Sequence, residues 1–259
     1  IHAAIARRQL RAVAVTAFGY ESGQAVTFYQ GRGSIDPWFR HRRVGVPTRL
    51  SLEHLLASAA IPLIFPPVKV NREYFGDGAV RQSAPISPAL HLGATRVLVV
   101  GVSGNPQGSG TPPRELPRTQ NARPPSLAQI GGHMLNSTFI DNLETDIELL
   151  ERLNQMSALV PPESRPRGLG LNPVDVLVIA PSQPLDQIAA RHQRELPKAL
   201  RLFLRGPGAT KAGGAGVLSY LLFEPGYCSE LIELGYQDAM TRKAELCRFL
   251  GLVEVAQPA

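Results

Sequence analysis

An unbroken apolar segment at Arg96–Val102, with the sequence RVLVVGV, constrains the fold of this chain more than any other feature. A β-branched run of this kind is typical of a strand that is buried on both faces in a mostly parallel sheet. The segment Val174–Ala180 (VDVLVIA) has the same character. Because strand-like segments alternate with helical periodicity along the chain, the pattern predicts an α/β fold with a helical C-terminal portion.

The first sixty residues contain further signals for strands and a helix. Arg11–Phe18 and Ala25–Gln30 have strand character, and the turn residues between them predict a hairpin. Residues 31–47 are expected to form an irregular basic segment. Ser51 is a suitable N-cap for a helix that runs to about Ala60.

The second half of the chain is predicted to be mainly helical after a loop. Residues 103–126 are rich in proline and glycine, which indicates a loop or linker. Apolar residues three or four positions apart predict a long helix between His133 and Met156. Further helices are predicted at 185–204, 214–223 and 227–250, the last with a break near Gly235.

Composition excludes several classes of function. The chain has 27 basic and 21 acidic residues, and this net charge of +6 is too small and too dispersed to indicate nucleic-acid binding. Its two cysteines, Cys228 and Cys247, are too few for a disulfide scaffold or a zinc knuckle. The six histidines show no i,i+4 pairing, and the glycine runs lack a G-K-[ST] motif, so neither a metal nor a cofactor is expected. No apolar run approaches the length needed to cross a bilayer.

Asp77 is the carboxylate with the most unusual setting. It lies between Gly76 and Gly78, directly after the pair Tyr74-Phe75. Glycines on both sides allow positive φ angles and a close approach of the backbone, so that the carboxylate can be held toward a fixed point. The alternative is an Asx turn, in which the side chain only satisfies its own loop. The local sequence leaves both interpretations open.

The sequence around Asp77 resembles the second signature block of the patatin-like phospholipases. The block comprises Ala57–Pro62 (ASAAIP), Phe65–Val68 (FPPV) and Tyr74–Val80 (YFGDGAV), and the spacing of these three parts makes the resemblance specific. It continues through Pro85 and residues 90–101. More loosely it extends to residues 174–181 and 218–237, which look like the bacterial branch of the family, and it therefore covers most of the chain.

This resemblance implies a lipid acyl hydrolase that cleaves carboxylic esters of phospholipids or related lipids through an acyl-serine intermediate, without cofactor or metal. Asp77 would be the general base of a Ser–Asp dyad, with its pKa raised by a dry, lipid-filled cleft. The resemblance also implies a three-layer, mostly parallel sheet flanked by helices. Residues 1–102 would belong to the core of one partial domain, residues 103–126 would form its loop, and residues 127–259 would supply a long helix, a strand and the C-terminal helices.

The chain departs from the family pattern at the nucleophile. It has neither a glycine-rich oxyanion loop nor a G-x-S-x-G nucleophile elbow. The nearest match, Gly101–Asn105, has its second glycine one place early and follows Asp77 instead of preceding it. Ser103 is therefore expected to be a loop residue. We expect the missing parts to lie before Ile1, so that this chain holds half of an active site and is inactive alone.

Two other functions stay open at this point: a catalytically inactive lipid-binding or regulatory module of the same fold, and a non-lipid esterase. Arg40–Arg43, with Trp38 and Phe39, would suit a peripheral contact with lipid headgroups. A solvated basic loop is the commoner fate of such a charge run. Headgroup preference and oligomeric state are not indicated by the sequence. We expect a cytoplasmic or peripheral membrane location.

Overall fold

The fold was obtained as a computed structural model. It describes residues 1–33, 35–62, 64–81, 86–102, 150–152, 154–156, 159, 173–198 and 219–252. The chain divides into two compact units, one formed by residues 1–97 and 138–176 and the other by residues 98–137 and 177–259. The assignment of residues 1–259 to one partial domain stays a prediction.

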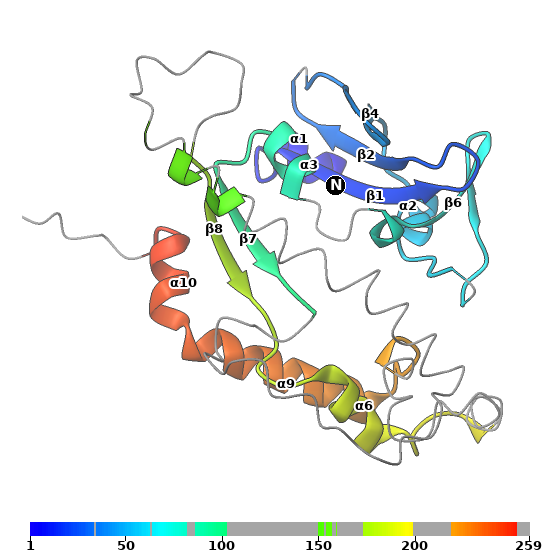
Figure 1. The fold of residues 1–259 in the computed structure, drawn as a ribbon, viewed down its shortest axis with the longest axis vertical. Coiled ribbons are helices and arrows are strands. Elements are labelled where there is room, and N and C mark those ends of the chain that lie inside the picture. The colour runs from blue at the N-terminus through cyan, green and yellow to red at the C-terminus, as the bar shows by residue number, and fades with distance from the viewer. Residues whose placement is uncertain are drawn as a thin grey trace, which may run out of the picture. The chain divides into compact units, whose positions relative to one another are not determined.

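A six-stranded sheet forms the centre of the first unit (Figure 1). Its strand order is β3-β4-β2-β1-β6-β5. The strands are β1 (Ala12–Gly19), β2 (Ala25–Gly31), β3 (Trp38–Arg40), β4 (Arg43–Pro47), β5 (Val68–Val70) and β6 (Glu73–Asp77). The predicted hairpin is confirmed, because β1 and β2 pair antiparallel from Ala12 opposite Gly31 to Phe18 opposite Ala25.

The prediction of an irregular segment at residues 31–47 was wrong. The segment contains β3 and β4, which pair with each other antiparallel, and β4 also lies parallel to β2. Parallel strands are not joined by a tight turn, so no local sequence pattern predicts the pairing of β4 with β2. The short strands and their many charged residues hide the remaining signal.

The strands of this sheet are mixed in direction. Only the β2–β4 pairing is parallel, and the other four pairings are antiparallel. The predicted mostly parallel sheet is therefore not confirmed for these six strands. The connections β1–β2, β3–β4 and β5–β6 are too short for the crossover that parallel neighbours require. A mixed sheet with accompanying helices agrees with the coarser α/β class.

The helices of the first unit are short and lie close to the sheet. They are α1 (His2–Ala6), α2 (Leu52–Ser58), the 3₁₀ turn η1 (Gly78–Val80) and α3 (Ile86–His91). The helix predicted after Ser51 is confirmed as α2, and the Nδ1 atom of His54 accepts the Ser51 backbone N–H at 3.1 Å. Helix α2 packs against the sheet through Ala57, which joins a buried cluster formed by Ala17, Val26, Phe28, Val70 and Phe75.

Two predicted strands form a separate sheet, β7 (Arg96–Val100) and β8 (Asp175–Ile179). The Asp175 N–H donates to the Thr95 carbonyl and the Gly101 N–H to the Ile179 carbonyl, so the two strands run in the same direction (Figure 1). The prediction that both faces of residues 96–102 are buried was wrong, because Val100 is 77% exposed. An apolar run identifies a strand here without fixing how many of its faces are covered.

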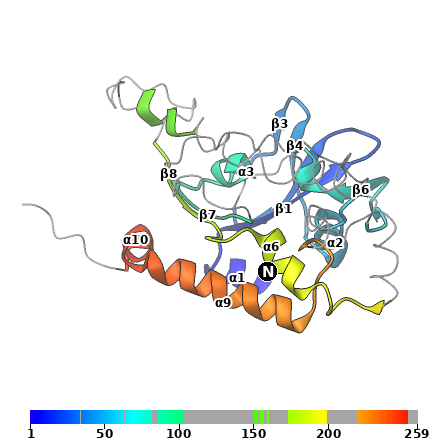
Figure 2. The same ribbon diagram turned by 60° about the horizontal axis from the view of Figure 1, so that its bottom comes forward.

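Apart from the ends of β7 and β8, the regular structure described in the second unit is helical. Its helices are α6 (Leu185–His192), α9 (Pro225–Thr241) and α10 (Lys243–Phe249), and α6 packs against α9 (Figure 2). The buried residues of this contact are Ile188, Ala189, Leu196, Leu222, Tyr227 and Leu234. None of the described helices has the length and apolar character that crossing a membrane requires.

Two of the predicted helix boundaries in this unit need correction. The helix expected over 185–204 is interrupted after His192, and Lys198 is again helical. Pro197 has no N–H to donate to the carbonyl of Gln193 and disfavours helical geometry in Leu196, so one continuous helix cannot form. The break expected near Gly235 lies instead at Arg242, between α9 and α10. The helices expected at 133–156 and 214–223 fall mostly outside the described residues, although residues 150–152 and 154–156 are helical.

Candidate active site

Asp77 lies at the end of β6, where two parts of the signature block meet. In the sheet it stands opposite Ala17 of β1. Its backbone N–H donates to the carbonyl of Ala60 at 2.9 Å, so the segment that follows α2 is fixed directly to the end of β6. The ASAAIP and YFGDGAV parts of the block therefore build one local structure around this aspartate.

The side chain of Asp77 is held by the turn that follows it. One carboxylate oxygen accepts the backbone N–H of Ala79 at 2.9 Å and caps the 3₁₀ turn η1. No described residue donates a hydrogen bond to the other oxygen. The Asx-type contact considered from the sequence is thus present, and it leaves half of the carboxylate available.

The two flanking glycines serve close packing. A Cβ atom on Gly78 would lie 2.6 Å from the carbonyl carbon of Thr16, which is main chain of β1. A Cβ atom on Gly76 would lie 2.8 Å from the Tyr20 ring. Neither glycine has a positive φ angle, so of the two roles predicted for these glycines only the close approach is found.

Asp77 lines a cavity of about 600 Å³ in the first unit. The walls come from β1, α2, the turn after β6 and α3, and they are mainly apolar: Ala14, Val15, Thr16, Leu55, Ser58, Gly78, Ala79, Pro88, Ala89 and Leu92. Burial raises the pKa of Asp77 above its ordinary value of 3.8, and the hydrogen bond from Ala79 offsets part of this effect. The site therefore holds a carboxylate that is a stronger base than a solvated aspartate.

Ser58 is a cavity residue that the sequence analysis did not single out. It lies at the end of α2 and lines the same cavity as Asp77. Its position inside the ASAAIP part of the block was the only signal for it. No hydrogen bond joins the two side chains, and Ser103 lies outside the described residues. Within the described part of the chain, no serine is therefore placed as a nucleophile against Asp77.

The aromatic residues of the basic segment have different surroundings. Trp38 is buried between Tyr29 and the His91 ring of α3, with ring centroids 5.0 Å and 4.6 Å away. It is consequently a core residue in this structure, and the membrane contact of this segment stays a prediction. Phe39 is 70% exposed.

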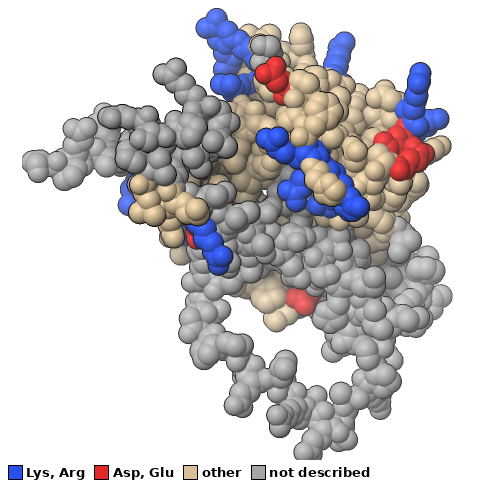
Figure 3. All heavy atoms as spheres, turned by 45° about the horizontal axis from the view of Figure 1, so that its top comes forward, with Lys and Arg blue, Asp and Glu red and all other residues tan. Residues whose placement is uncertain are grey.

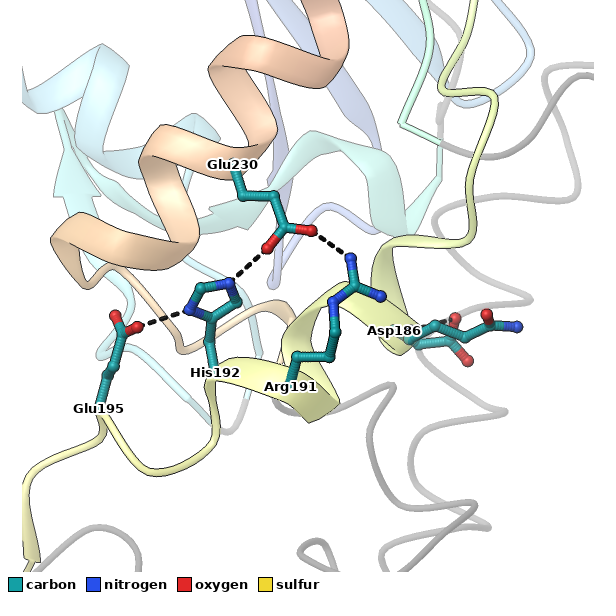
Figure 4. Close-up of polar contacts among 6 residues, drawn as sticks. Asp186, Arg191, His192, Glu195 and Glu230 are labelled. Carbon is teal, nitrogen blue, oxygen red and sulfur yellow. Dashed lines mark hydrogen bonds and ion pairs between the residues drawn. The ribbon is translucent and has the colours of Figure 1, made fainter.

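A second polar cluster lies in the helical unit, and the sequence analysis did not predict it. His192 of α6 approaches Glu195 through Nδ1 and Glu230 of α9 through Nε2, both at 2.5 Å, and Arg191 also pairs with Glu230 (Figure 4). The hydrogen bond to Glu195, followed by that to Glu230, raises the pKa of His192 above 6.5. This cluster links α6 to α9. Among the described residues, no group of three or more His, Cys, Asp or Glu is arranged to hold a metal ion.

The region around Asp77 is similar to a known protein family. Residues 27–90 match the model of the patatin-like phospholipases. The matched segment runs from β2 into α3 and includes Asp77, both flanking glycines and most of the cavity lining. The resemblance to the patatin-like phospholipases is therefore confirmed over this part of the chain. Neither the curated proteins nor the solved structures give a significant match.

Proposed function

We propose that this chain supplies the aspartate of a Ser–Asp dyad to a lipid acyl hydrolase, with Asp77 as the general base. The observation that carries the proposal is the position of Asp77 in the wall of a largely apolar cavity of about 600 Å³. The match of residues 27–90 to the patatin-like phospholipases supports the same activity. Such a cavity suits the acyl chain of a lipid ester better than a polar substrate.

The environment of Asp77 explains how an aspartate acts without a histidine. A carboxylate with its ordinary pKa of 3.8 accepts a proton from a hydroxyl poorly. Burial raises that pKa, and the Ala79 N–H fixes one oxygen so that the other is free to face the nucleophile. The turn therefore supplies the orientation of the carboxylate, and burial supplies its basicity.

The proposed reaction proceeds in two steps that both use this carboxylate. The serine oxygen attacks the ester carbonyl while its proton passes to Asp77, and the leaving alcohol then takes that proton. In the second step water attacks the acyl-serine and gives a proton to Asp77, which passes it to the departing serine oxygen, so that the fatty acid and the free serine are released. Because residues 1–259 contain no G-x-S-x-G motif, we propose that the serine and the oxyanion donors belong to a segment N-terminal to Ile1.

An Asp77→Asn variant tests the proposal in the protein that includes the serine. Asparagine keeps an oxygen for the Ala79 N–H but cannot accept the serine proton, so hydrolysis of micellar lipid esters should fall by about a hundredfold to ten-thousandfold. Asp36→Asn is the matched control, because Asp36 is exposed and lies outside the cavity. Normal turnover in the Asp77→Asn variant, with the control unchanged, would sink the assignment.

A non-catalytic lipid-binding module is the second candidate, and one observation favours it. Among the described residues, no serine hydroxyl donates to Asp77. A serine-directed phosphonate probe separates the two functions, because a hydrolase is labelled at its nucleophile. Binding of a fluorescent fatty acid without any labelling supports the module. A comparison of soluble short esters with micellar lipids tests the third possibility, a non-lipid esterase.

A further inference from the structure

A second cavity in the first unit has a different chemical character. It encloses about 620 Å³ and is lined by Arg40, His41, Arg42, Arg43, Val80, Arg81 and Ser87. These residues come from the β3–β4 hairpin, the turn that begins at η1, and α3. Among the described residues, four arginines and no carboxylate thus border this cavity. Figure 3 shows several Lys and Arg side chains on one face of the molecule, interspersed with a few Asp and Glu.

The charge of this cavity is not balanced within the described part of the chain. None of its four arginines forms an ion pair or a side-chain hydrogen bond with a described residue. Arginines elsewhere do find such partners, for example Arg191 with Glu230 and Arg242 with Glu245. Like charges that share a cavity repel one another, so a bound anion would stabilise this arrangement.

The hairpin that carries three of the arginines is held firmly against α3. Trp38 of β3 stacks on His91, at the end of α3, with the ring centroids 4.6 Å apart. Gly45 of β4 makes room for this indole, since a Cβ atom there would overlap the Trp38 ring. The stack therefore positions Arg40–Arg43 beside Ser87 before any ligand binds, which lowers the entropic cost of binding.

Arg42 has a backbone conformation that its side chain does not favour. Arg40 pairs with Arg43, so His41 and Arg42 form a two-residue turn, and Arg42 has a φ angle of 58°. This left-handed region is usually occupied by glycine or asparagine. Strained non-glycine residues cluster at functional sites. Arg8 and Asn71 share this conformation, but of these three residues only Arg42 lines the cavity.

We propose that this cavity, separate from the Asp77 cavity, binds the phosphate group of a phosphate monoester. The planar guanidinium group donates two parallel hydrogen bonds to phosphate oxygens, and a monoester near neutral pH carries close to two negative charges. The four arginines carry more than enough positive charge to neutralise it, and the Ser87 hydroxyl adds a neutral donor. The phosphate belongs either to a small soluble compound or to a lipid headgroup. The inference does not depend on hydrolysis at Asp77.

An Arg42→Gly variant tests the inference because the two roles of this residue respond in opposite directions. Glycine relieves the backbone strain and should raise the melting temperature, whereas loss of the guanidinium should weaken phosphate binding by about tenfold or more. Arg8→Gly is the matched control. Arg8 also has a positive φ angle, 62°, and it lies outside the cavity. It should gain the same stability and lose the same net charge with no change in phosphate binding.

Calorimetric titration with glycerol 3-phosphate, against acetate at equal ionic strength, gives the soluble arm. Co-sedimentation with phosphatidylcholine vesicles, with and without phosphatidic acid, gives the lipid arm. If the protein binds glycerol 3-phosphate and Arg42→Gly does not, the site exists and its ligand is soluble. If the protein binds only the vesicles with phosphatidic acid and Arg42→Gly does not, the site exists and its ligand is a lipid headgroup. Absence of binding in both arms, equal binding of acetate, or equal binding by Arg42→Gly and Arg8→Gly would overturn the inference.

Discussion

Replacing Gly78 with alanine should destabilise the first unit strongly. The new Cβ atom would lie 2.6 Å from the carbonyl carbon of Thr16, closer than nonbonded carbon atoms approach one another. Because that carbon is main chain of β1, a side-chain rotation cannot relieve the overlap, and either β1 or the turn after β6 must move. Overpacking a well-packed interior costs about 1–3 kcal/mol. With backbone on both sides of the contact, we expect a loss of about 3 kcal/mol or more.

Gly235→Ala is the control, because the same substitution there should have the opposite sign. Gly235 lies inside α9, and nothing is within 4 Å of where its Cβ would be. Alanine at an open helical position stabilises by about 1 kcal/mol relative to glycine. Urea unfolding measures both variants: fluorescence of Trp38, the only tryptophan, reports on the first unit, and far-ultraviolet circular dichroism reports on the helices.

The informative result is the urea midpoint seen by Trp38. If Gly78→Ala leaves that midpoint unchanged, β6 does not approach β1 as closely as described, and the placement of Asp77 in its cavity fails with it. If the midpoint falls while Gly235→Ala raises the helical midpoint, the close approach is confirmed. The wall of the Asp77 cavity at Thr16 then has the geometry on which the proposed base depends.

Three further predictions concern pH and packing. Because burial raises the pKa of Asp77, the folded protein binds a proton at this carboxylate more tightly than the unfolded chain does, and its contribution to stability falls as pH rises above 3.8. The melting temperature of Asp77→Asn should therefore rise relative to that of wild type over that pH range. A difference that stays constant with pH would contradict this. Because Glu195 and Glu230 raise the pKa of His192, its stabilising contribution is present below pH 6.5 and is lost as pH rises through the raised value. The helical melting temperature should therefore fall above pH 6.5, less so in high salt, and His192→Gln should flatten the profile. Gly45→Ala should cost about 1–3 kcal/mol and shift the tryptophan emission to longer wavelength, because the methyl group displaces a buried indole.

The parts of the fold that could be predicted are those whose signal is local. The hairpin of β1 and β2 follows from two strand-like segments around a short turn, and α2 follows from Ser51 and the helical residues after it. Hairpins and capped helices are built from neighbours in sequence, so their residues carry the information.

The errors arose where the deciding contacts are distant or absent. Strand β4 pairs with β2 in parallel, and no pattern within residues 31–47 predicts which strand β4 pairs with. Gly235 does not interrupt α9, because a single glycine lowers the stability of a helix of 17 residues without ending it. In β7 the alternation of exposure arises from which face its neighbours cover, and the apolar run cannot report this.

The same distinction separates the two cavities. The local environment of Asp77 is determined by a few consecutive residues. Gly76 and Gly78 permit close packing, and Ala79 supplies the N–H that holds the carboxylate. Sequence alone could therefore single out the aspartate, although not the cavity walls contributed by β1 and α3.

The arginine cavity has no comparable local signature. It forms only where the β3–β4 hairpin packs against α3, and this contact depends on Trp38 stacking on His91, 53 positions further along the chain. The short turn after β6 nevertheless belongs to both cavities: Asp77, Gly78 and Ala79 line the apolar one, while Val80 and Arg81 line the basic one. The turn that holds the proposed base thus also carries one of the guanidinium groups of the proposed phosphate site. A structural change in this turn must alter both cavities, whereas a change confined to Arg42 alters only the second.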